Sequence, residues 1–138
     1  MEKEPYMQEE LKYPSIEAVK TVLSKIGVNL ETRDLDCQDY EYTTCLLEEL
    51  PDYIELYQDI DTSVLEKRVL GCYLLECLNQ FIVINDKVHP KQDLALELLF
   101  SDIEIHKSEI AYFSKTEGIK EQERWPIAKY LSNLINEK

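Results

Sequence analysis

SVLEKRVLGCYLLECLNQFIVIN, residues 63–85, is the stretch that decides the fold. Ser63, followed three residues later by Glu66, forms the capping-box pattern that begins a helix. Beyond Leu70, apolar side chains occupy nearly every face of this helix. A helix that is apolar all round does not face water and lies in the middle of a bundle. The sequence therefore predicts a central helix that ends at Asn85 and is surrounded by other helices.

Shorter amphipathic segments flank this stretch on both sides. Residues 14–27 carry apolar residues at helical spacing between Ser15, a suitable N-cap, and Gly27, a suitable C-terminal residue. Pro51 cannot continue a helix but fits the first turn of one. The remaining helices are expected over residues 40–50, over 51–60, over 91–115 with a break near Ser101 and an end at Gly118, and from Trp125 to the C-terminus.

Residues that favour tight turns are scarce. The 138 residues include three glycines and five prolines, whereas sandwiches and barrels need many turns. The length fits one domain. We therefore predict an all-α, single-domain bundle of five or six helices over residues 1–138, with residues 1–12 as a loose N-terminal arm. The alternating polarity of DIEIHK leaves a short strand pair near residues 102–113 as the alternative.

The sequence also bears on location and on the cysteines. The first fourteen residues, MEKEPYMQEELKYP, lack the apolar core of a signal peptide. Residues 64–84 are interrupted by charged side chains and are too polar for a membrane span. These features predict a cytoplasmic protein, in which thiols stay reduced. The cysteine spacing matches no C-x-x-C pattern, so we assign the thiols to the core: Cys37, Cys45, Cys72 and Cys77.

Motifs of catalysis and metal binding are missing. The sequence has no P-loop, no G-x-S-x-G and no G-x-G-x-x-G. His89 and His106 are not spaced as zinc ligands. Asp34-x-Asp36 begins like a calcium loop, but Asp39 replaces the glycine that the turn needs. We therefore expect a protein without enzymatic activity, metal or cofactor. A small enzyme that uses its carboxylates is the weaker alternative.

Negative charge is concentrated in one quarter of the chain. The net charge is −13, and residues 31–61 hold eleven acidic residues and one basic residue, Arg33, which gives −10. This balance disfavours nucleic-acid binding, because phosphates would be repelled. A solvated helix face is the plainer interpretation, but exposed helices usually mix both signs of charge. Concentrated charge of one sign favours a basic protein partner.

Four tyrosines lie among these acids, within DLDCQDYEYTTCLLEELPDYIELYQDID, residues 34–61. Tyrosine gives a large contact area at a small entropy cost, and carboxylates speed the capture of a basic partner. The sequence leaves open whether Tyr53 and Tyr57 belong to the core or to the interface. The predicted partner-binding residues are Asp36, Asp39, Tyr40, Tyr42, Glu48, Glu49, Asp52, Tyr53, Glu55, Tyr57 and Asp59.

In size, acidity and the Asp/Glu-and-Tyr character of residues 34–61, the chain resembles the immunity proteins of bacterial toxin systems. These include helical colicin immunity proteins and the immunities of contact-dependent growth-inhibition toxins. The resemblance implies a bacterial, cytoplasmic inhibitor that covers the basic active site of a cognate toxin, such as a nuclease. A helical adaptor that binds a cellular protein without inhibiting an enzyme is the alternative.

Overall fold

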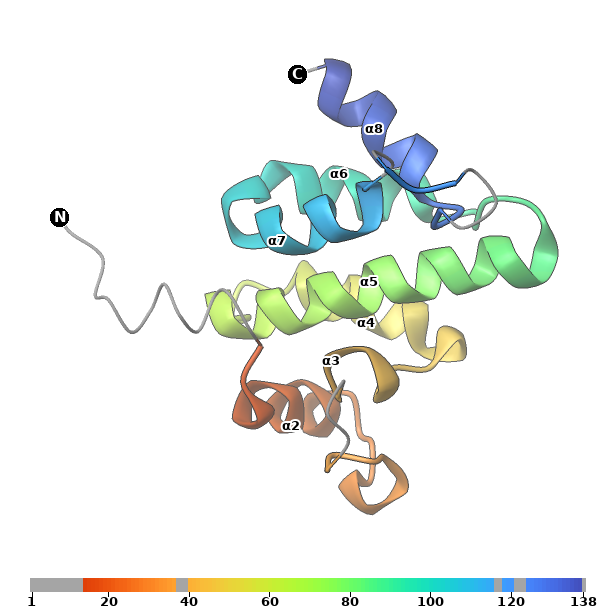
Figure 1. The fold of residues 1–138 in the computed structure, drawn as a ribbon. Coiled ribbons are helices and arrows are strands. Elements are labelled where there is room, and N and C mark those ends of the chain that lie inside the picture. Colours follow the sequence, from red (N-terminus) through yellow and green to blue (C-terminus); the bar gives the residue numbers. More distant parts are fainter. Residues whose placement is uncertain (1–13, 37–39, 116–117, 121–123, 138) are drawn as a thin grey trace, which may run out of the picture.

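Helix α5, Val64–Asn85, runs through the middle of the structure (Figure 1). At its start the Ser63 side chain accepts a hydrogen bond from the backbone N–H of Glu66, as the capping pattern predicts. It ends where Asp86 adopts a left-handed conformation, with φ 55°. Between Arg68 and Asn79 every residue except Glu76 is buried. The prediction of a central helix is confirmed for residues 68–79, whereas Val83 and Ile84 near its end are exposed.

The computed structural model describes residues 14–36, 40–115, 118–120 and 124–137, and these residues are all-α without a strand. The prediction of an all-α bundle is confirmed; the expected arm, residues 1–12, lies outside the described residues. Besides α5, the described helices are α2 (Ile16–Lys25), α3 (Tyr40–Thr43), α4 (Leu50–Tyr57), α6 (Gln92–Ser101), α7 (Ile103–Ser114) and α8 (Ala128–Glu137), with short 3-10 helices η1 (Leu30–Thr32) and η2 (Leu47–Glu49).

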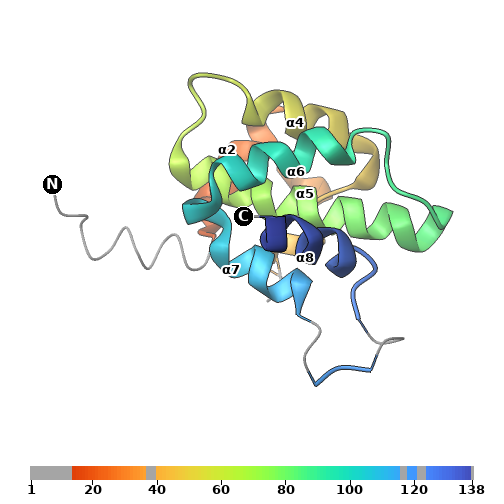
Figure 2. The same ribbon diagram turned by 90° about the horizontal axis from the view of Figure 1, so that it is seen from above.

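The other helices pack around α5. Helices α6, α7 and α8 lie on one side of α5, and α2 and α3 lie on the other (Figure 1). Helix α4 runs alongside α5, as the view from above shows (Figure 2). The expected break near Ser101 separates α6 from α7. None of the helices in the described part of the chain is long and apolar enough to cross a membrane.

Residues 103–113 lie in helix α7, with Asp102 as its N-cap, so the segment is helical as predicted and the alternative of a strand pair is not observed. One local expectation was wrong. The expected helix over residues 40–50 stops after Thr43, because side chains take over its hydrogen bonds. The Thr44 hydroxyl donates to the carbonyl of Tyr40, and the N–H of Leu46 donates to the Tyr53 hydroxyl at 2.9 Å. Such side-chain bonds offer the backbone an alternative to the helix.

Buried polar groups join α5 to α7. The Arg68 guanidinium is wholly buried and lies 2.6 Å from a carboxylate oxygen of Glu109. A second oxygen of Glu109 accepts a hydrogen bond from the Tyr42 hydroxyl, so α3 joins the same cluster. One turn away, Gly71 permits close approach of α7, since a Cβ at this position would lie 2.4 Å from Nδ1 of His106. These contacts fix the two helices in one register.

Candidate protein-binding surface

Helix α4 presents acidic residues on one face and core residues on the other. Pro51 lies in its first turn, as predicted. Asp52, Glu55 and Asp59 follow at helical spacing and are exposed, and Glu48 precedes them by about one turn. We call these four residues, Glu48, Asp52, Glu55 and Asp59, the acidic stripe.

None of the carboxylates of the acidic stripe forms a close ion pair within the described part of the chain. Lys25 lies nearby, but its ammonium group is 2.5 Å from the Glu66 carboxylate, which raises the pKa of Lys25. Lys25 also attracts Asp59 at longer range, and the stripe otherwise faces solvent with a negative charge that no close cation balances.

Glu49 does not belong to this exposed set, although the sequence places it there. Its carboxylate lies 2.5 Å from the Arg33 guanidinium and accepts a hydrogen bond from the Tyr53 hydroxyl at 2.6 Å. Arg33 also donates to the carbonyl of Thr44 at 2.7 Å. Glu49 therefore helps to hold the acidic segment together, and its role as a partner contact stays a prediction.

A cleft opens beside the acidic stripe, between the end of α2 and the exposed face of α4. Its volume is about 410 Å³. Lys25 also lines the cleft, where it is paired with Glu66 and attracts Asp59, and the three other charged residues that line it are acidic. The geometry suits a cationic side chain such as lysine or arginine. The lining residues are Lys25, Ile26, Gly27, Asp52, Glu55, Leu56 and Asp59.

Tyr53 and Tyr57 are core residues. Their exposed fractions are 0% and 3%, so neither ring is available to a partner. Burial raises the pKa of both phenols. The Tyr57 hydroxyl contacts Asp102 at 2.8 Å and Nε2 of His106 at 2.6 Å. Their assignment as interface residues is corrected: amphipathic spacing turns both rings inward, away from the carboxylates on the same helix.

Tyr40 and Tyr42 are partly buried and also bind inward. The Tyr40 hydroxyl donates to the carbonyl of Pro14 at 2.8 Å. The Tyr42 ring packs edge-on against Phe113, and its hydroxyl bonds to Glu109. All four tyrosines therefore attach the acidic segment to the domain.

One apolar residue of the acidic segment, Ile60, is almost fully exposed, whereas the four tyrosines are partly or wholly buried. Ile60 is 96% exposed and lies in the turn between α4 and α5, flanked by the exposed carboxylates of Asp59 and Asp61. The sequence predicts Ile60 as the last residue of a helix, and Asp61 is not among the predicted partner-binding residues. The pattern Asp-Ile-Asp directly after an amphipathic helix was the available signal. Asp34 and Asp36 are exposed as well, and Asp39 lies outside the described residues.

The buried polar groups do not form an accessible catalytic site. His106 and Cys72 are both wholly buried. Burial lowers the pKa of His106 to about 3 and raises the pKa of Cys72, so both groups are held neutral. Cys45, Cys72 and Cys77 are free, buried thiols, which confirms their assignment to the core, while Cys37 lies outside the described residues. The described residues contain no cluster of ligands suited to a metal ion.

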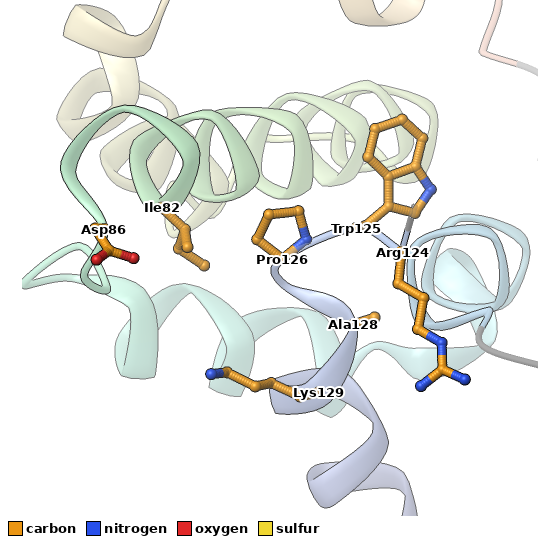
Figure 3. Close-up of a pocket in the computed structure, with 7 residues that line it drawn as sticks. All are labelled: Ile82, Asp86, Arg124, Trp125, Pro126, Ala128 and Lys129. Carbon is orange, nitrogen blue, oxygen red and sulfur yellow. The ribbon is translucent and has the colours of Figure 1, made fainter. Parts of the chain in front are cut away.

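A second hollow lies at the opposite end of α5, with a volume of about 310 Å³. Figure 3 shows Ile82 and Pro126 close together in it, with Asp86 toward one end and Arg124 toward the other. Its charges are of both signs, since Lys129 also lines it. This mixture defines no single ligand chemistry, so the acidic stripe and its cleft are the stronger candidate site.

Comparisons of the chain with protein-family models, curated proteins and solved structures find no match.

Proposed function

We propose that this protein is a non-catalytic inhibitor that binds a basic protein through the acidic stripe. The partner we propose is the cognate toxin domain of a bacterial toxin system, of the nuclease class, which would make this chain its immunity protein in the cytoplasm. The supporting observation is the acidic stripe itself: four exposed carboxylates on one face that have no ion-pair partner in the described part of the chain.

The like charges of the acidic stripe cost the protein some stability. Like charges at helical spacing repel one another and weaken a helix slightly. Arg33 is paired with Glu49, and Lys25 is paired with Glu66 and attracts Asp59 only at longer range, so much of the repulsion remains. A basic partner would remove the repulsion on binding, and the negative field would raise its rate of association. A nuclease site, which must attract phosphate, offers the complementary positive surface.

The test is protection of growing cells from the toxin encoded by the adjoining reading frame. The variant Asp52→Lys with Glu55→Lys reverses two exposed carboxylates of the stripe. The matched control, Asp93→Lys with Glu97→Lys, changes the net charge by the same amount on an exposed part of α6. We expect the control to protect cells like the wild type, and the stripe variant to lose protection while remaining folded.

Binding measured with the purified, catalytically inactive toxin domain gives the quantitative result. The stripe variant should associate at least tenfold more slowly at low salt, because steering depends on the local field. Equal protection and equal binding by both variants would show that the stripe is only a solvated face. A loss shared equally by both variants would show that net charge acts without a defined surface.

A further inference from the structure

Ile60 contributes almost nothing to the stability of the fold. Burial of an isoleucine side chain provides about 1.5–3 kcal/mol, but this side chain stays 96% exposed. Among the exposed large apolar residues, Ile84 at 70% comes next. A single exposed apolar residue is ordinary on a protein surface. The position of Ile60, between two exposed carboxylates and next to the acid-lined cleft, is what sets it apart.

The turn that carries Ile60 is held by a set of hydrogen bonds. The N–H of Asp61 donates to the Asp59 carboxylate at 2.9 Å, and the N–H of Thr62 donates to the Asp59 carbonyl at 3.1 Å. The Thr62 side chain is buried, and its hydroxyl donates to the carbonyl of Leu56 at 2.5 Å. The backbone that carries Ile60 is therefore held in one conformation. A preorganised backbone loses little conformational entropy when the turn is bound.

We infer that Ile60 is the apolar anchor of the binding surface and inserts into an apolar pocket of the basic partner. Asp59 and Asp61 then pair with lysine or arginine side chains around that pocket. This arrangement, an apolar centre with a charged rim, is the usual form of an interface hot spot. The inference rests on the proposed function, because the toxin domain is the partner.

The negative charge of this surface favours a basic partner over a second copy of the chain. In a symmetric dimer the same surface meets itself, so Asp59 and Asp61 would face the acidic surface of the other protomer. Like charges placed opposite one another across an interface disfavour the contact by several kcal/mol. A basic partner gains from the same carboxylates. A positively charged partner can therefore cover Ile60 without electrostatic repulsion, whereas a second copy of the chain cannot.

The experiment measures binding kinetics of the purified, catalytically inactive toxin domain from the adjoining reading frame. Ile60→Ser is the test variant, and Ile84→Ser is the control, since Ile84 is exposed at the far end of α5. We expect Ile60→Ser to dissociate about tenfold faster or more with little change in association rate, as loss of an anchor requires. Ile60→Leu should retain most of the affinity, and Ile84→Ser should bind like the wild type.

The outcomes separate the inference from the proposed function. If Ile60→Ser binds like the wild type while the double Asp52→Lys, Glu55→Lys variant does not, the anchor is wrong and the proposed function stands. If the wild type does not bind the toxin domain, both are wrong. Sedimentation of the wild type and Ile60→Ser gives an independent result: a dimer that Ile60→Ser dissociates would identify a second copy as the occupant and overturn the inference.

Discussion

At the scale of single residues, the least expected feature is the position of His106. Its ring is wholly buried, packs against Gly71 and contacts the Tyr57 hydroxyl. The charged groups around it are Arg68 and Lys67 on α5 and Asp102 at the start of α7. Burial, with the positive charge of Arg68, lowers the pKa of His106 from 6.5 to about 3. The folded protein therefore holds this imidazole neutral over the physiological range.

This pKa predicts how stability depends on pH. Between about pH 6.5 and pH 3 the unfolded chain binds a proton at His106 that the folded chain does not, so stability falls as the pH falls. Between pH 7 and pH 5 the loss is roughly 2 kcal/mol. Urea unfolding at both values should show it, and His106→Asn should reduce the difference between them. An unchanged difference in His106→Asn would mean that other groups cause the loss.

At the scale of helices, α5 could be predicted from its sequence, but the attachment of its neighbours could not. A helix that is apolar on every face can bury its surface only in the middle of a small domain. The sequence of residues 63–85 was therefore sufficient to predict that this helix is central. The break after Thr43 could not be predicted, because it depends on Tyr53 and Tyr73, which meet Leu46 and Thr44 only in the folded state. The same limit left Tyr53 and Tyr57 open between core and interface, because the sequence does not show which way their rings face, and the structure places both in the core.

The ion pair between α5 and α7 yields a prediction at this scale. Glu109→Gln removes the carboxylate that neutralises the buried guanidinium of Arg68. Removing one partner of a buried ion pair costs about 3–5 kcal/mol, because the remaining charge stays desolvated. Chemical denaturation should show this loss for Glu109→Gln. The exposed pair Lys107–Glu104 on the same helix is the control, and Glu104→Gln should cost less than about 1 kcal/mol. Similar small losses in both variants would contradict a buried role for Glu109.

At the scale of the whole molecule, the net charge is −13, and residues 31–61 account for −10 of it. Electrostatic repulsion between like charges is therefore concentrated in this region. Salt screens exposed charges beyond about 8–10 Å, so it relieves this repulsion. We expect the melting temperature of the wild type to rise between low salt and 0.5 M sodium chloride, on the order of a few degrees. The Asp52→Lys, Glu55→Lys variant should respond less than the Asp93→Lys, Glu97→Lys control. A melting temperature that falls with salt would show that attractive pairs dominate instead.

The inward attachment of the four tyrosines has a consequence for engineering. Tyr40, Tyr42, Tyr53 and Tyr57 hold residues 40–57 on the domain from within, and Asp59 holds the turn before α5. The side chains of Glu48, Asp52, Glu55 and Ile60 are exposed and have no such role. A library randomised at residues 48, 52, 55, 60 and 61, with the tyrosines and Asp59 kept, should consist largely of folded members. The domain would then serve as a scaffold whose binding partner is changed by substitutions on its surface, while its core stays unchanged.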